Sequence, residues 1–163
     1  MKRIINEMKL RLPARSENEG VARTAVCAFV AELNPTVEEL GDIRLAVSEA
    51  VTNCVVHAYP ERKAGECAYI YISARIYEQG EISVEISDNG CGIAKERLDG
   101  LFLGYAGKLA DSSDSGKRNL GIGLSVCATI VKAHGGSISA ENAKSGGAIF
   151  RFSLPLEEVS HEQ

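Results

Sequence analysis

The 163-residue chain contains no tryptophan, and it has no apolar run close to the roughly 20 residues that a membrane-spanning helix needs. Its first residues, MKRIINEMKLRLP, include basic side chains but no apolar stretch, so we expect no secretory signal peptide. Positive charge is not in excess, because 18 lysines and arginines stand against 22 aspartates and glutamates. The formal net charge of −4 disfavours direct nucleic-acid binding through a broad basic surface. We therefore expect a cytoplasmic protein without membrane contact.

Cysteine occurs in an odd number, and no two cysteines have the C-x-x-C spacing that is typical of redox or metal sites. We expect free thiols in a reducing compartment and no zinc site, since such a site needs clustered cysteine or histidine. The five residues are Cys27, Cys54, Cys67, Cys91 and Cys127.

Length predicts one domain over residues 1–163. A chain of this size buries roughly 70% of its unfolded surface on folding, so it needs no disulfide or metal for stability. The content of 45% hydrophobic and 25% charged residues is ordinary for a soluble globular protein.

Apolar periodicity and capping patterns predict three helices. Ser16 and Glu19 form a capping-box pattern for a helix that runs to about residue 33. Thr36 and Glu39 form a second capping box, for a helix that ends before residue 60. A third helix is expected over residues 123–134. Strands are predicted at 8–12, 67–76, 81–88, 137–142 and 148–154.

Residues 94–119 follow neither pattern, and the stretch ADSSDSGKRN at 110–119 is polar, so we expect a long functional or flexible loop. Twelve of the 16 glycines lie from residue 90 onward, which indicates backbone that must approach something closely. The order of elements predicts an α+β two-layer sandwich. Its sheet is expected to be mixed and mostly antiparallel, with three main helices on one face.

Glu49 and Asn53 are four residues apart on the second predicted helix, so they share a face. An amide oxygen can ligate Mg²⁺, which prefers oxygen donors, and a carboxylate can accept a proton from an attacking hydroxyl or water. Taken alone, the pair favours a solvated glutamate and a helix-surface asparagine, because the spacing E-x-x-x-N is common by chance.

Asp88 directly follows a predicted strand and begins the sequence DNGCG. An ionised aspartate offers only acceptors, so it could receive the exocyclic amine of adenine but not the carbonyl of guanine. Gly90 and Gly92 would let a flat ring lie against bare backbone. The alternative is an ordinary Asp-Asn-Gly turn.

Gly121, Ile122, Gly123 and Leu124 open the third predicted helix, where free N–H groups and the helix dipole favour an anion. The basic residues just before them could reach a terminal phosphate when the loop closes, or they could form a solvated charge run; they are Lys108, Lys117 and Arg118. His57 and His134 are expected to be packed or capping residues without a catalytic role.

Three motifs, in this order, resemble those of the GHKL ATPases: EAVTN at 49–53, DNGCGI at 88–93, and GIGL at 121–124 after a polar loop. That family includes gyrase, histidine kinases and MutL-type proteins. The resemblance covers residues 10–155 and implies the Bergerat fold, with ATP and Mg²⁺ held beneath a flexible lid at about 94–119. It implies that Asn53 is the Mg²⁺ ligand and Asp88 the adenine reader. The other implied nucleotide-binding positions are Gly90, Gly92, Ile93, Lys117, Gly121, Ile122, Gly123 and Leu124.

Two halves of the chain resemble different branches of that family. NEGVAR at 18–23 and VSEAVTNCVVHAY at 47–59 look like anti-sigma factors that are serine protein kinases, and Arg23 matches their partner-surface arginine. Residues 120–155 look more like the catalytic domain of a sensor histidine kinase. Glu49 favours the first branch, because a hydroxyl acceptor gains typically about 10²–10⁴-fold from a base whereas an imidazole nitrogen needs none.

The resemblance is incomplete at two places. The family usually has a threonine at the position of Ala148, and its hydroxyl helps to hold adenine through water, so nucleotide affinity is expected to be weaker here. The lid is also longer than in the anti-sigma kinases, which leaves its phosphate-contacting residue open among Lys108, Lys117 and Arg118.

These observations favour an ATP-dependent serine/threonine kinase of the anti-sigma type, with Glu49 and Arg118 as catalytic residues. Its expected partners are a sigma factor and an antagonist protein, and a homodimer is suggested by analogy alone. One alternative is a histidine-kinase-type ATP domain that donates phosphate to a histidine on another protein. A second is a nucleotide-gated binding module with little turnover.

Overall fold

The computed structural model of the chain describes residues 1–59, 67–103 and 118–156, and for residues 118–122 it describes the backbone alone. Five strands form one sheet in the order β1-β2-β3-β5-β4, and each of the four neighbouring pairs is antiparallel. The strands are β1 (Ile4–Pro13), β2 (Tyr69–Tyr77), β3 (Glu81–Asp88), β4 (Ser137–Asn142) and β5 (Ala148–Pro155).

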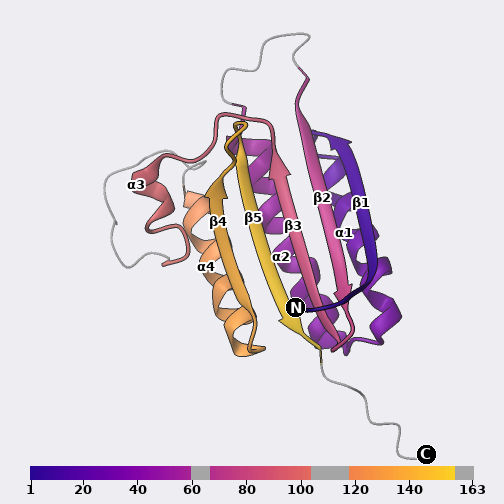
Figure 1. The fold of residues 1–163 in the computed structure, drawn as a ribbon. Coiled ribbons are helices and arrows are strands. Elements are labelled where there is room, and N and C mark those ends of the chain that lie inside the picture. Colours follow the sequence, from indigo (N-terminus) through magenta and orange to yellow (C-terminus); the bar gives the residue numbers. More distant parts are fainter. Residues whose placement is uncertain (60–66, 104–117, 157–163) are drawn as a thin grey trace, which may run out of the picture.

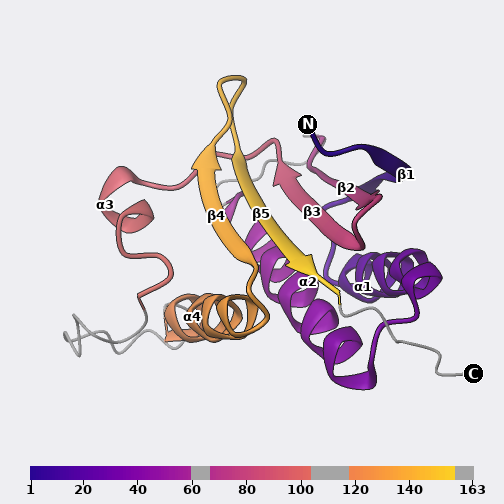
Figure 2. The ribbon, with the colours of Figure 1, turned by 60° about the horizontal axis from the view of Figure 1, so that its bottom comes forward.

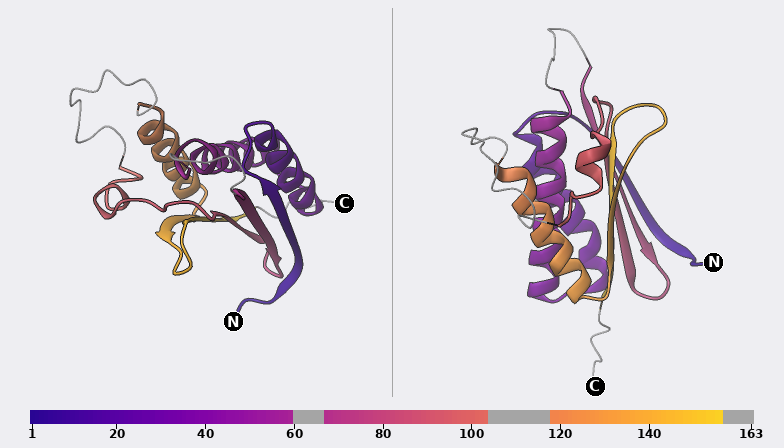
Figure 3. Two further views of the ribbon diagram at one scale, coloured as in Figure 1. Left: turned by 90° about the horizontal axis from the view of Figure 1, so that it is seen from above. Right: turned by 90° about the vertical axis from the view of Figure 1, so that its left-hand side faces the viewer.

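Three long helices cover one face of this sheet, and the opposite face carries no helix in the described part of the chain (Figures 1 and 3). They are α1 (Asn18–Val30), which a 3-10 turn (Ala31–Leu33) extends, α2 (Val37–His57) and α4 (Arg118–Ala133). A fourth helix, α3 (Lys95–Leu98), is a single turn beside the β4 edge (Figure 2). The α+β two-layer class predicted from the sequence is confirmed.

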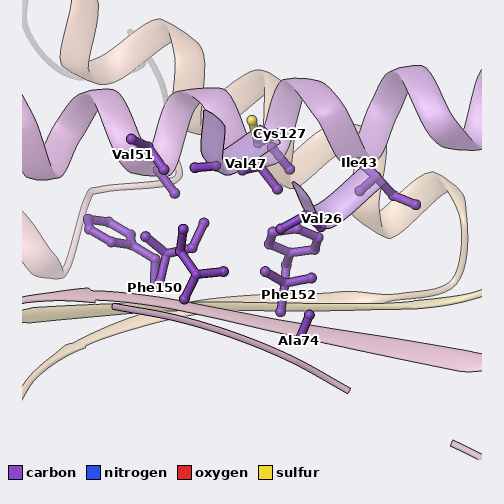
Figure 4. Close-up of a cluster of buried hydrophobic side chains, with 14 of the residues drawn as sticks. Val26, Ile43, Val47, Val51, Ala74, Cys127, Phe150 and Phe152 are labelled. Atoms are coloured by element: carbon purple, nitrogen blue, oxygen red, sulfur yellow. The ribbon is translucent and has the colours of Figure 1, made fainter. Parts of the chain in front are cut away.

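The core lies between the helical layer and the sheet (Figure 4). Strand residues alternate strictly, so that β2 and β3 send every second side chain inward to meet the helices. Val26 of α1, Val47 of α2 and Cys127 of α4 reach the same cluster as Phe150 and Phe152 of β5. This shared core fixes where the ends of α2, β3 and β5 lie relative to one another.

Several element boundaries differ from the sequence prediction. β1 begins at Ile4, four residues before the predicted start. The Ser16–Glu19 capping box is wrong: Glu17 already has helical φ and ψ, and no side chain caps α1. The third main helix begins at Arg118, so Gly121 and Gly123 lie inside it and not at its first turn. The predicted loop over 94–119 contains α3, and its residues 104–117 lie outside the described part of the chain.

The second predicted capping box is confirmed, and it anchors the end of α2 that lies farthest from β3's carboxyl end. The Thr36 hydroxyl accepts a hydrogen bond from the Glu39 N–H at 3.1 Å, and the Glu39 carboxylate accepts one from the Thr36 N–H at 2.8 Å. The second of these bonds explains why the Glu39 side chain is buried.

We predict that Thr36→Ala lowers the free energy of unfolding by about 1 kcal/mol, because it removes the side-chain acceptor at the start of α2. Urea unfolding followed by circular dichroism measures this change. Ser16→Ala is the matched control and is expected to leave stability within about 0.5 kcal/mol, as surface substitutions usually do. Equal losses for both substitutions would contradict the assignment of the cap.

Candidate functional site

A cavity of about 540 Å³ opens where α2 and β3 end and β5 begins. These three ends meet at one edge of the sheet, the upper edge in Figure 1. The segment after β3, which leads into α3, forms the remaining wall. The lining residues are Asn53, Val56, His57, Ala58, Asp88, Cys91, Gly92, Ile93, Ala94, Arg97, Leu101, Ala148 and Phe150.

Asp88 forms the buried acidic end of this cavity, with 5% of its surface exposed. Its Oδ1 accepts hydrogen bonds from the backbone N–H of Gly90 at 2.9 Å and of Ala148 at 3.2 Å. The carboxylate is therefore fixed by β5 and by its own turn, and no lysine or arginine among the described residues pairs with it. It can act as a hydrogen-bond acceptor toward a ligand.

Asn53 lines the same cavity and is 8% exposed. Among the described residues its amide has no hydrogen-bond partner. The amide oxygen is thus available to a ligand or to a metal ion in the cavity, and it suits Mg²⁺, which prefers oxygen donors.

Glu49 lies one helical turn before Asn53, but it does not line the cavity. Its carboxylate packs against α4, where a methyl group at Gly123 would overlap it. Burial raises the pKa of the Glu49 carboxyl above its usual range, and the nearby Glu19 carboxylate raises it further. No described lysine or arginine forms an ion pair with it.

The glycines after Asp88 are needed for chain packing. A methyl group at Gly90 would overlap the carbonyl of Ala58, whose oxygen also accepts the Cys91 N–H at 2.9 Å. Gly92 has φ of +78°, and a methyl group there would lie 2.8 Å from Oδ1 of Asn142. Gly92 lines the cavity whereas Gly90 faces the end of α2.

Two anchors of this site were missed by the sequence analysis. The Asn142 side chain, at the end of β4, clamps the backbone of Ile93: its Oδ1 accepts the Ile93 N–H and its Nδ2 donates to the Ile93 carbonyl, both at 2.7 Å. Asn89 Oδ1 lies 2.6 Å from the Tyr59 hydroxyl and accepts the Tyr69 N–H at 3.0 Å. Burial raises the pKa of Tyr59 to about 12, so this network keeps its proton.

The remaining predicted positions are placed as follows. Leu124 is 1% exposed and belongs to the core. Lys108 and Lys117 lie outside the described residues, and for Arg118, Gly121 and Ile122 the backbone alone is described, within α4. His57, expected to be packed or capping, lines the cavity together with Arg97 of α3. Burial lowers the pKa of His57, and Arg97 lowers it further.

A profile of the family of histidine kinase-, DNA gyrase B-, and HSP90-like ATPases matches residues 39–158. The chain belongs to this family. Members of this ATPase family bind nucleotide, and the acidic and amide side chains of the cavity fit that role. Within the described residues, no helix is both long enough and apolar enough to span a bilayer.

Anti-sigma F factors are among the curated relatives that match. One from Clostridium perfringens is 52% identical over 88 residues, which cover 54% of this chain and 60% of that protein. One from Caldanaerobacter subterraneus is 51% identical over 88 residues, which cover 54% and 58%. One from Heyndrickxia coagulans is 46% identical over 89 residues, which cover 55% and 58%. The matched region thus spans about 60% of the length of these relatives.

Solved structures share the fold at low identity. The RsbU and RsbW domains of a Mycobacterium tuberculosis protein align with a TM-score of 0.59 at 17% identity, over 93% of this chain and 32% of that one. A mycobacterial sensor histidine kinase aligns with a TM-score of 0.57 at 15% identity, over 92% of this chain and 100% of that one. Both confirm the predicted ATPase fold.

Arg23, the predicted partner-binding residue of this chain, lies on α1 and not at the cavity. Its Nη1 lies 3.3 Å from Oε1 of Glu19, one turn earlier on the same helix. Its Nε is buried without a hydrogen-bond partner among the described residues. Glu19 also lies close enough to Glu49 of α2 for its negative charge to raise the pKa of the Glu49 carboxyl.

We predict that Asn142→Ala speeds hydrogen exchange at the Ile93 amide, because both bonds that hold this backbone are lost. The bonds contribute roughly 1–3 kcal/mol together, which corresponds to about 5–150-fold faster exchange. Amide exchange followed by NMR measures the effect. Ser139→Ala, an exposed substitution on the same strand, is the control. Unchanged protection at Ile93 would contradict the clamp.

Proposed function

We propose that this protein binds Mg²⁺-ATP and transfers the terminal phosphoryl group to a serine or threonine hydroxyl of a partner protein, as a kinase of the anti-sigma factor type. The observation that carries the proposal is the nearly buried, unpartnered Asn53 amide in the same cavity as the backbone-held Asp88 carboxylate, with Glu49 one turn away. The relatives named anti-sigma F factors support the partner class.

Asp88 would select adenine. Its Oδ1 accepts two backbone N–H groups, and the Cys54 thiol also bonds to the carboxylate. A carboxylate has about four acceptor sites, so a further site would accept the exocyclic amine of the base. Guanine would present a carbonyl oxygen at that place and be repelled. Ala148 supplies an N–H to Asp88 but no hydroxyl toward the base, and loss of one hydrogen bond weakens binding by about 0.5–1.5 kcal/mol.

Asn53 would hold Mg²⁺ through its amide oxygen, and the ion neutralises phosphate charge when bound. The residues fit such an ion, because the amide is buried, unpartnered and at the cavity wall. Further phosphate contacts are proposed for the start of α4 and the segment before it: Lys117, Arg118, Gly121, Ile122 and Gly123.

Glu49 would act as the general base. It takes the proton of the acceptor hydroxyl while that oxygen forms a bond to the terminal phosphorus and the bridging oxygen leaves with ADP. The raised pKa of Glu49 makes its carboxylate a more effective proton acceptor, because a general base works best when its pKa approaches the working pH. The carboxylate now packs on α4, so it must turn from Gly123 toward the cavity to reach a hydroxyl.

Arg23 is proposed as a contact for the partner, which would be a sigma factor or its antagonist. The alternative of a histidine acceptor rests on the histidine-kinase-like second half of the sequence. It predicts acid-labile phosphate on the partner, whereas transfer to a hydroxyl leaves acid-stable phosphoserine or phosphothreonine. Mapping the phosphosite on proteins captured with Mg²⁺-ATP separates these two outcomes.

We predict that Asp88→Asn lowers ATP affinity by roughly 10–100-fold and abolishes the preference for ATP over GTP. The asparagine oxygen can still accept the Gly90 and Ala148 N–H groups, so the fold is kept, while its NH₂ replaces the acceptor that faces adenine. Calorimetry with both nucleotides measures the change. Asp99→Asn, at an exposed carboxylate outside the cavity, is the control. Unaltered selectivity in Asp88→Asn would refute the adenine assignment.

We predict that Glu49→Gln slows phosphoryl transfer by about 10²–10⁴-fold and leaves ATP affinity nearly unchanged. In the wild type, the transfer rate should fall as pH drops through the raised pKa of Glu49, because the protonated carboxyl cannot accept a proton. Glu96→Gln, at an exposed glutamate on α3, is the control. Transfer at the wild-type rate by Glu49→Gln would remove Glu49 from the mechanism.

A further inference from the structure

Cys91 places a thiol on the wall of the cavity. Its side chain is exposed, and it lines the cavity with Asn53 and Asp88. The sulfur lies 3.4 Å from the carbonyl oxygen of Gly92 and 3.8 Å from that of His57. The Cys91 N–H donates a hydrogen bond to the carbonyl oxygen of Ala58, so the backbone that carries this thiol is held against the end of α2.

The other cysteines do not share this position. Cys54 and Cys127 are buried, Cys27 is half-buried, and burial raises the pKa of all three thiols. Cys67 is exposed like Cys91, but it does not line the cavity. Cys91 is therefore the one cysteine of the five that is both exposed and on the wall of the cavity.

A separate observation shows that this space offers a polar group to a ligand. Asn53 is more than nine-tenths buried, faces the same cavity, and has no hydrogen-bond partner among the described residues. A cavity of about 540 Å³ takes one small-molecule ligand at a time. A group attached to Cys91 starts from the wall of that volume, so it competes directly with whatever Asn53 and Asp88 bind.

We infer that Cys91 is a modification site at which a low-molecular-weight disulfide of the glutathione type forms a mixed disulfide and excludes nucleotide from the cavity. The inference rests on the proposed nucleotide site. The Cys91 thiolate attacks one sulfur of the small disulfide, a new S–S bond forms, and the original S–S bond breaks. The Cys91 sulfur is oxidised, the released thiolate is the reduced product, and it takes up a proton. A free thiol reverses the step.

The experiment uses the full chain in reduced form, incubated with oxidised glutathione and then mapped by mass spectrometry. ATP affinity is measured by calorimetry before the treatment, after it, and after dithiothreitol. We expect modification at Cys91 to lower ATP affinity at least tenfold and dithiothreitol to restore it. We also expect saturating Mg²⁺-ATP to slow modification of Cys91 but not of Cys67.

Cys91→Ser and Cys67→Ser are the matched variants, and each is compared with its own untreated form. Cys67→Ser should still lose ATP binding on treatment, and Cys91→Ser should not. The inference is overturned if treated wild type binds ATP with unchanged affinity, if Cys91→Ser loses binding as wild type does, or if ATP leaves the labelling rate of Cys91 unchanged. Failure of the untreated chain to bind ATP would overturn the proposed function itself.

Discussion

The candidate site depends on one carboxylate that is fixed by main-chain hydrogen bonds. Asp88 ends β3, and Ala148 begins the neighbouring strand β5, so the sheet itself sets the distance between the acceptor and its donor. The Gly90 N–H completes the arrangement from the same turn. Since no described cation neutralises Asp88, the negative charge is stabilised by dipoles and remains able to accept a further donor. The cavity takes its chemical character from this arrangement.

Local sequence patterns predicted the fold where the interactions are themselves local. The Thr36–Glu39 box was predictable because both partners lie within one turn. The Ser16 pattern failed because the chain is already helical at Glu17, and Asn18 bonds back to the carbonyl of Pro13 instead. The early start of α4 was missed because glycines at 121 and 123 disfavour helix, although packing of α4 on α2 outweighs that preference.

The site was predictable in part for the same reason. Asn53 and Asp88 belong to short motifs, and the structure brings both to one cavity. Asn142 and Asn89 could not be found, because they hold segments 49 and 20 residues away in the sequence and no local pattern marks such contacts. The expectation that Gly90 and Gly92 leave room for a flat ring stays a prediction, and the fold adds a packing role for both. A sequence shows that a side chain is absent there, but only the fold shows that Ala58 and Asn142 occupy the space.

The contact between Gly123 and Glu49 has a consequence for the relation of two helices. At Gly123, where α4 touches the carboxylate, the helix has no side chain. The adjacent residues in the sequence, Ile122 and Leu124, have branched side chains. A helix advances about 1.5 Å per residue, so sliding or turning α4 by a single residue would drive a branched side chain into Glu49. This contact therefore fixes the register of α4 against α2, and the Glu49 carboxylate can turn toward the cavity only by changing its rotamer.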